Sequence, residues 1–291
     1  MAIPYTANQF IEMQLNSDLN SIERHFEADG IAIAGPMLVD VDGLIRNSID
    51  SINNKKAALV CILTTNGGYI EVVSRIVDVF RQHYDSVIFI VPDHAYSAGT
   101  ILVMSGDEIF MDYYSRLGPI DPQIEQSDGK LLPALGYLER YEELVQKAKD
   151  GKITGAEIQV MMSCFDQAAL YDYEQAKELS ISLLEDWLVQ YKFKDWQKTQ
   201  SRGMTVTKAM KSKRAREIAK ELNNTKRWHS HGRGISRDVL VRDLKLMIED
   251  FGTDPDLDRK VRSYHVLLED YMVKQSQSGV IHTYLNYVPY C

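Results

Sequence analysis

The sequence predicts an α/β fold, in which parallel strands joined by crossover helices form a core and a mostly helical C-terminal region follows. Short continuous apolar runs, typical of strands buried on both faces, alternate with segments of helical periodicity up to about residue 130. Beyond about residue 133 the helical spacing continues, while strand-like runs disappear. The alternation of strand and helix favours parallel pairing through right-handed crossovers.

Composition limits the classes of protein that remain. The chain has 291 residues, 45% of them hydrophobic, which suffices for a large core in one domain with an appendage or in two domains. A net charge of -8 and a pI near 5.4 argue against binding to nucleic acid or an anionic membrane. The first residues lack a signal-peptide pattern, and no apolar run approaches the roughly 20 residues that cross a bilayer.

Cysteine usage indicates the compartment. The three cysteines, Cys61, Cys164 and Cys291, are far apart and form neither a metal-binding nor a disulfide pattern. A reducing, cytoplasmic setting fits this usage best, and neither a metal nor a cofactor is expected.

The expected core elements follow one another at short intervals. Mixed polar and apolar spacing predicts an N-terminal helix over residues 6–28. Apolar runs predict strands at 31–35, 57–63, 87–91 and 108–111. Helical spacing between them predicts helices at 43–54, 70–84 and 97–105.

The later segments are expected to be helical, over residues 134–149, 155–180, 182–200, 205–222, 236–251 and 256–275. Residues 280–288 are weakly patterned and fit either an edge strand or an arm. The expected organisation is therefore an N-terminal helix (1–28), an α/β core (29–132), a helical region that contributes to the active site and to oligomer contacts (133–275), and a tail (276–291).

Two strand-to-helix turns carry chemistry. Glycines in Asn66-Gly67-Gly68 allow positive φ and close approach of a substrate to the backbone, or they serve the turn geometry alone. Ser97, in Tyr96-Ser97-Ala98-Gly99-Thr100, stands where a helix begins. It is either a nucleophile beside free N–H groups or a helix N-cap. Together the two turns can place a nucleophile next to oxyanion donors.

Two further segments supply candidate partners. Pro119 and Pro122 fix the backbone around Asp121, so its carboxylate either orients a catalytic base or bonds to its own turn. In Trp228-His229-Ser230-His231-Gly232, a histidine has the right pKa to take a proton from serine. The competing interpretation is a polar loop that breaks a helix, and no further ligands support a metal site.

These blocks resemble the Clp-fold serine proteases, and the closest branch is the serine dehydrogenase proteinases. The resemblance rests on Leu63 to Gly68, Tyr96 to Thr100, Gly106 to Ile109 and Leu117 to Gln123, in the family's order. It spans residues 57–123, with weaker likeness from residue 30 and at 228–236. Relatives include the Clp protease subunit, signal peptide peptidase A and, more distantly, the crotonases.

The resemblance implies a ClpP/crotonase-like core and a role for each matched residue. Ser97 corresponds to the nucleophile, and the N–H groups of Gly68 and Ala98 to the oxyanion hole. It further implies a homo-oligomer, with an unfoldase or adaptor as a possible further partner. Where Clp subunits carry a histidine on the next strand segment, this chain has Ile120-Asp121-Pro122 and no histidine.

The general base is consequently open between two classes of residue. His231 is preferred because His231-Gly232-Arg233 resembles a late histidine block of this branch, and His229 is next. A serine–lysine dyad would use Lys130 or Lys147, since a buried lysine can lose its proton near neutral pH. His94 precedes the turn and is less favoured, and a site without a functional base is the remaining alternative.

The predicted function is peptide-bond hydrolysis by a serine endopeptidase that acts on peptide or protein substrates. One alternative is a crotonase-type enzyme acting on acyl-CoA, which would use the paired amides without Ser97 as nucleophile. Another is a catalytically inactive oligomeric scaffold. Covalent labelling of Ser97 would support the peptidase. Tight acyl-CoA binding with activity that survives Ser97→Ala would support the second, and the absence of labelling under any condition the third.

Overall fold

A seven-stranded sheet lies at the centre of the computed structural model, which describes residues 6–120, 123–125, 131–199, 203–228 and 233–291. The strand order is β10-β5-β3-β2-β1-β11-β12. Five strands run parallel to one another: β1 (Asp29–Ala34), β2 (Ala58–Thr64), β3 (Ser86–Val91), β5 (Glu108–Met111) and β10 (Glu249–Asp250). Strands β11 (Val280–His282) and β12 (Tyr287–Pro289) add antiparallel beside β1. The α/β prediction is confirmed.

The apolar runs form strands because both faces of the sheet are covered. In β2, Leu59, Cys61 and Leu63 pack into the hydrophobic cluster on one face, while Val60 and Ile62 belong to the cluster on the other. This alternation is the period of two that a strand imposes on its side chains. All five residues are buried, which explains why the sequence shows a continuous run.

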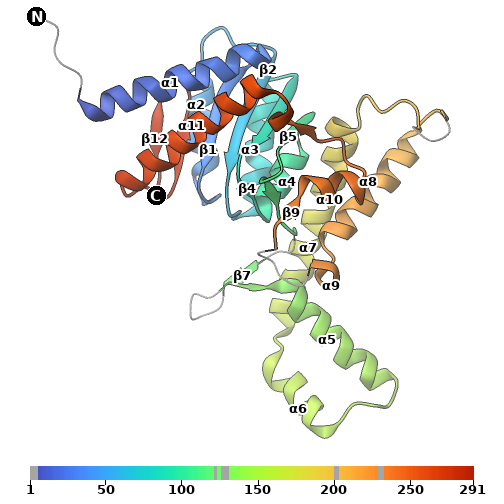
Figure 1. Cartoon of the computed structure of the whole chain (residues 1–291). Helices are drawn as coiled ribbons and strands as arrows, with labels where there is room; N and C mark the ends of the chain where they lie inside the picture. The colour runs from blue at the N-terminus through green and yellow to red at the C-terminus, as the bar shows by residue number, and fades with distance from the viewer. Residues whose placement is uncertain (1–5, 121–122, 126–130, 200–202, 229–232) are drawn as a thin grey trace, which may run out of the picture.

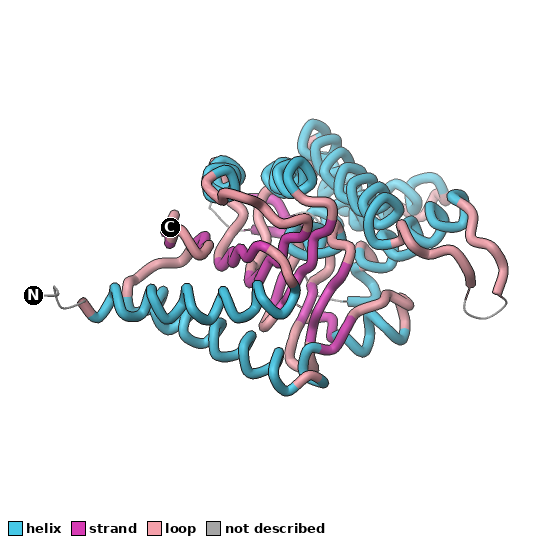
Figure 2. Tube along the Cα trace, turned by 90° about the horizontal axis from the view of Figure 1, so that it is seen from above, coloured by secondary structure: helices cyan, strands magenta, loops and turns pink. Residues whose placement is uncertain are grey.

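Two helical layers enclose the sheet, as Figures 1 and 2 show. One face is covered by α1 (Ala7–Phe26) and α11 (Pro255–Lys274), whose buried residues share one hydrophobic cluster. The other face is covered by α2 (Val41–Asp50), α3 (Ile70–His83) and α4 (Ala98–Met104). Helices α7 (Gln167–Trp187) and α8 (Lys208–Leu222) extend this second layer.

Local sequence sets the ends of the long helices. The Thr6 side chain accepts a hydrogen bond from the Gln9 N–H, and Gln9 reaches back to Thr6, which is a capping box at the start of α1. Asp254 caps α11, where Pro255 occupies the first helical turn. Both helices therefore begin close to the starts of the predicted segments 6–28 and 256–275.

Smaller elements surround the sheet. A second sheet has the order β4 (His94–Ala95), β6 (Arg116–Leu117) and β9 (Ile235–Ser236), and β7 (Gln123–Glu125) pairs with β8 (Leu131–Pro133). Helices α5 (Ala134–Lys149) and α6 (Gly155–Cys164) extend away from the sheet in Figure 1. The remaining short helices are α9 (Thr225–Trp228), α10 (Arg237–Arg242) and the 3₁₀ segment η2 (Phe251–Thr253). Among the described helices, none has the length and apolar character needed to cross a membrane.

The chain beyond residue 133 is mostly helical, as expected, but it contains the short strands β9 and β10, which were not predicted. β9, β10, β11 and β12 all follow that point, and three of them join the central sheet. These strands are two or three residues long, too short for an alternating pattern to be visible in the sequence. Residues 280–288 form a hairpin at the sheet edge, which is the first of the two alternatives expected for them.

Three predicted helices are also shorter than expected. The segment 155–180 is interrupted at residues 165–166, because the Asp166 side chain caps a new helix by accepting from the Ala169 N–H. The segment 182–200 contains only the end of α7 and a π-helical turn, η1 (Leu188–Lys192). The segment 236–251 contains α10 and then turns into β10. Helix α11 returns to the sheet and covers one of its faces.

His282 joins three elements in the interior. Its Nδ1 lies 2.6 Å from the Tyr264 hydroxyl of α11, and its Nε2 lies 2.9 Å from the Asn16 Oδ1 of α1. Burial favours the neutral imidazole, in which an Nε2–H that donates to the amide oxygen leaves Nδ1 to accept from the Tyr264 hydroxyl. Burial lowers the pKa of His282 to about 4.

Stability is therefore expected to fall in mild acid. The unfolded chain, whose histidine pKa is about 6.5, binds a proton between about pH 6.5 and 4 that the folded protein does not bind. The stability that the neutral His282 contributes is complete above that window. It is lost as pH falls, by about 2 kcal/mol at about pH 5. Urea unfolding at about pH 7.5 and pH 5 measures it. His282→Gln should lose less stability between the two conditions than His83→Gln, and an equal loss would contradict the assignment.

Candidate active site

The two strand-to-helix turns singled out in the sequence meet through Thr65. The Thr65 N–H donates to the His94 carbonyl over 3.0 Å, and the Tyr96 N–H donates to the Thr65 carbonyl over 2.9 Å. The Thr65 hydroxyl also accepts the Gly67 N–H at 3.0 Å. Thr65 thus fixes the glycine turn and the Ser97 turn against each other. The only local signal for it is its place between a buried strand and the glycines.

Ser97 adopts a backbone conformation that serine rarely occupies. Its φ is 53° and its ψ is -121°, and it precedes the first residue of α4. Such a conformation costs on the order of 1–3 kcal/mol and persists only where the surrounding structure imposes it. The half-buried side chain makes no capping hydrogen bond, so the helix-cap interpretation is not supported. The sharp turn presents the hydroxyl as a nucleophile elbow does.

Both glycines of the first turn are sterically required. At Gly67, φ is 101° and a Cβ atom would lie 2.8 Å from the Ser97 Cβ and 3.3 Å from the Ala98 nitrogen. At Gly68, φ is 147° and a Cβ atom would lie 2.3 Å from the Met37 carbonyl oxygen. Real Cβ atoms do not approach this closely. The turn therefore lies directly against Ser97, with no side chain between them.

Two backbone N–H groups near Ser97 remain available. Ala98 is the first residue of α4, so its N–H has no acceptor within the helix. Gly68 forms a bridge with Met37, but the bonds of this bridge are donated by Met37 to Gly67 and by Tyr69 to Met37. Within the described part of the chain, the Gly68 N–H has no acceptor. The site thus contains a hydroxyl and two candidate oxyanion donors.

Thr100 attaches the segment after β6 to the Ser97 helix. Its hydroxyl accepts the Gly118 N–H at 2.9 Å and lies 2.7 Å from the Ala95 carbonyl. A Cβ at Gly118 would lie 3.0 Å from the Tyr96 ring. The Ile120 N–H then donates to the Leu222 carbonyl at the end of α8 over 3.2 Å. The family resemblance of these residues gives no sign of this anchoring role.

His94 carries a carboxylate partner and influences the pKa of His265 on α11. Its Nδ1 lies 3.0 Å from Asp93 Oδ2, and its ring lies 4.8 Å from the Tyr96 ring. Burial lowers the pKa of His265 on α11, while Glu269 and Asp93 oppose the shift and His94 adds to it. Burial also raises the pKa of Tyr96, with Asp93 acting in the same direction. His94 thus belongs to a cluster beside α11.

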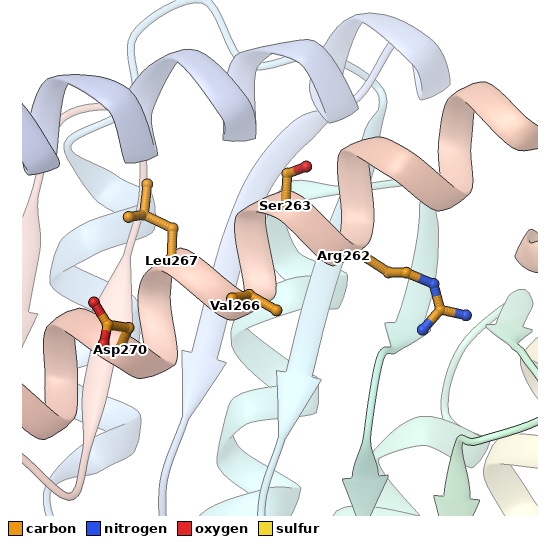
Figure 3. Close-up of a pocket in the computed structure, with 5 residues that line it drawn as sticks. All are labelled: Arg262, Ser263, Val266, Leu267 and Asp270. Carbon is orange, nitrogen blue, oxygen red and sulfur yellow. The ribbon is translucent and has the colours of Figure 1, made fainter.

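The pocket in Figure 3 lies on the outer side of α11 and has a volume of about 500 Å³. Its lining residues all come from that helix: Arg262, Ser263, Val266, Leu267 and Asp270. Because α11 and α4 cover opposite faces of the sheet, the pocket does not include Ser97.

Most of the predicted partners of Ser97 lie outside the described residues, namely Asp121, Lys130, His229 and His231. Lys147 lies in the last turn of α5, where its Nζ is 2.6 Å from Glu157 Oε1. This contact, first among the causes, lowers the pKa of Glu157 to about 2. The α5–α6 hairpin extends away from α4 (Figure 1).

The sequence of residues 30–208, more than half of the chain, matches the family of ClpP-like SDH-type serine proteinases. The chain belongs to this family. The matched residues include Gly68, Ser97 and Lys130, whereas His229 and His231 lie beyond them. The predicted family is confirmed.

Two curated relatives come from Methanocaldococcus jannaschii. Uncharacterized protein MJ1495 is 34% identical over 89 residues, 31% of this chain and 29% of that protein. Uncharacterized protein MJ0137 is 33% identical over 132 residues, 43% of this chain and 44% of that protein. The matches thus span less than half the length of either relative.

Solved structures with a similar arrangement include two mutant forms of the 1510-N membrane-bound stomatin-specific protease. One, in complex with a substrate peptide, has a TM-score of 0.44 at 15% identity and covers 75% of this chain and 72% of that chain. The other has a TM-score of 0.43 at 13% identity and covers 75% and 76%.

Proposed function

We propose that the protein is a serine endopeptidase that hydrolyses peptide bonds through an acyl-enzyme on Ser97. The observation that carries the proposal is the uncapped Ser97 hydroxyl at a strained turn, in a chain that belongs to a serine-proteinase family. The same family membership favours peptide hydrolysis over the acyl-CoA alternative and over an inactive scaffold.

In the proposed mechanism the Ser97 Oγ attacks the scissile carbonyl carbon while a general base takes the hydroxyl proton. The N–H groups of Gly68 and Ala98 hold the negative charge that develops on the carbonyl oxygen. When the tetrahedral intermediate collapses, the base returns the proton to the leaving amine. Water then attacks the acyl-enzyme by the same route and regenerates Ser97.

His231 remains the first candidate for the base, with His229 next and Asp121 as the group that orients it. The described residues next to the histidine block support this choice. Trp228 is buried and donates from Nε1 to the Glu221 carbonyl over 2.7 Å. On the other side, Ile235 in β9 pairs with Leu117 in β6, and Leu117 pairs with Ala95, two residues before Ser97.

Lys130 is the main alternative base, because it lies inside the family match and directly precedes β8. Lys147 is the weakest candidate, since its ammonium group already pairs with Glu157. A charged lysine in an ion pair has no lone pair to accept the serine proton.

A fluorophosphonate probe tests the mechanism, because it forms a covalent adduct only with an activated serine. We expect wild type to be labelled at Ser97, Ser97→Ala to remain unlabelled, and His231→Ala to lose at least about 10²-fold in labelling rate. His83→Ala, on α3, is the matched control and should label at the wild-type rate. Loss in Lys130→Ala with normal labelling of His231→Ala would assign the base to the lysine. Absence of a wild-type adduct at any pH would refute the peptidase proposal.

A homo-oligomer in the cytoplasm, with peptide delivery by an unfoldase or adaptor, is part of the same proposal. No residue of α6 is buried, although Ile158, Val160 and Met162 are apolar and 43%, 45% and 80% exposed. The region 133–275 would supply such contacts through its projecting α5–α6 hairpin. Light scattering after size-exclusion chromatography measures the assembly.

A further inference from the structure

The amide of Gly68 is positioned by a single backbone bridge to Met37. The Met37 N–H donates to the Gly67 carbonyl over 2.8 Å, and the Tyr69 N–H donates to the Met37 carbonyl over 3.0 Å. These two bonds hold the peptide groups on either side of Gly68. Any displacement of Met37 therefore rotates the Gly68 N–H relative to Ser97.

Met37 is in turn held through the carbonyl of Pro36. That oxygen accepts the Tyr290 hydroxyl at 3.1 Å and the Leu38 N–H at 3.0 Å. Pro36 O and Met37 N belong to the same peptide group. One side of this peptide thus accepts a hydrogen bond from the Tyr290 hydroxyl, while its other side donates one to the glycine turn. Hydrogen bonds on both sides of a peptide group polarise and strengthen one another.

Tyr290 is fixed by the hairpin of β11 and β12. Its N–H donates to the Gly279 carbonyl over 2.9 Å, and β12 pairs with β11 through Val280 and Pro289. A Cβ at Gly35 would lie 2.8 Å from the Tyr290 hydroxyl, and one at Gly279 would lie 2.4 Å from its ring. Two glycines therefore make room for the ring. Burial raises the pKa of Tyr290, so its hydroxyl keeps the proton that it donates.

We propose that Tyr290 is a positioning residue for the oxyanion-binding amide of Gly68, acting through the Pro36–Met37 peptide. This inference rests on the proposed function of Gly68. It links the C-terminal hairpin, which the sequence presented as an edge strand or arm, to the chemistry at Ser97. Tyr290 itself touches neither substrate nor nucleophile.

The test removes one hydroxyl and leaves the ring in place. Tyr290→Phe is compared with Tyr287→Phe. The second substitution removes another hydroxyl of the same hairpin, which donates to Gln277 Oε1 over 2.7 Å. We expect Tyr290→Phe to lower kcat and the rate of Ser97 phosphonylation about tenfold with KM unchanged, since a misplaced donor acts on the transition state. Tyr287→Phe should keep the wild-type kcat. Equal kcat in the two variants would overturn the inference.

A second measurement does not depend on activity. Amide hydrogen exchange of the peptides covering residues 35–40 and 64–72 should be faster in Tyr290→Phe than in wild type, and unchanged in Tyr287→Phe. If wild type failed to react at Ser97, the peptidase proposal would fail. The exchange comparison would still decide whether Tyr290 holds the Gly67-Gly68 turn in place. Unchanged exchange in Tyr290→Phe would refute the positioning role, whatever the activity.

Discussion

Replacing Ser97 by glycine is expected to abolish hydrolysis and covalent labelling, and yet to give a more stable protein than Ser97→Ala. Both variants lack Oγ, so both should lose at least about 10⁴-fold in hydrolysis. The φ of 53° strains any residue with a Cβ atom, and glycine removes that strain of about 1–3 kcal/mol. Glycine loses more backbone entropy than alanine on folding, and this loss offsets about 0.5–1 kcal/mol of the relieved strain. The net advantage over alanine should be about 1 kcal/mol in urea unfolding.

Ser51 provides the matched control because it has ordinary helical geometry, with φ -70° and ψ -18°. There Ser51→Gly should be less stable than Ser51→Ala, the reverse of the order at Ser97. A Ser97→Gly protein no more stable than Ser97→Ala would show that the turn stores no strain at this residue. Retained labelling in either Ser97 variant would show that the probe reacts elsewhere.

Replacing Gly67 by alanine should inactivate the site although no functional group is removed. The added Cβ would lie 2.8 Å from both the Ser97 Cβ and the Tyr96 carbonyl oxygen, so the two turns must separate. It would also lie 3.3 Å from the Ala98 nitrogen, where the substrate oxyanion is proposed to bind. We expect labelling of Ser97 to fall at least about 10³-fold. The positive φ of 101° should add a loss of about 1–3 kcal/mol in stability.

Gly43→Ala is the control for this substitution. A Cβ at Gly43, within α2, meets no atom within 4 Å. Alanine should therefore stabilise the helix there by about 0.5–1 kcal/mol and leave the labelling rate unchanged. Circular dichroism checks that both variants fold. If folded Gly67→Ala reacted at the wild-type rate, the glycine turn would not border the reacting atoms.

The parallel core could be predicted because its signals are local. The strands β2 and β3 have continuous apolar runs, since helices cover both of their faces. The pairing of β11 with β1 has no such signal, because Ala32 lies opposite His282, which is distant in the sequence. The break before α7 was missed because apolar residues continue through Phe165, although Asp166 can cap a helix.

The residues of the candidate site likewise divide into those with a local signal in the sequence and those without one. Ser97, Gly67 and Gly68 were found because each stands at a turn whose backbone requirement is visible in neighbouring residues. Met37 was missed because it acts through its backbone N–H and carbonyl, which leave no signal in the residue type. Tyr290 was missed because its hydroxyl acts on a backbone carbonyl that is distant in the sequence. The roles assigned to Asp121, His229, His231 and Lys130 stay predictions that the labelling experiment separates.

The position of β11 and β12 beside β1 also bears on the order of events during synthesis. A growing chain contains Ser97 and the glycine turn long before Val280 to Tyr290 leave the ribosome. Until then β1 has one unpaired edge, and the Pro36 carbonyl lacks the Tyr290 hydroxyl. On the proposed mechanism, such a nascent chain thus carries the nucleophile and the Ala98 N–H, while the Gly68 N–H is not yet fixed. The full rate of hydrolysis would therefore require the pairing of β11 and β12 beside β1.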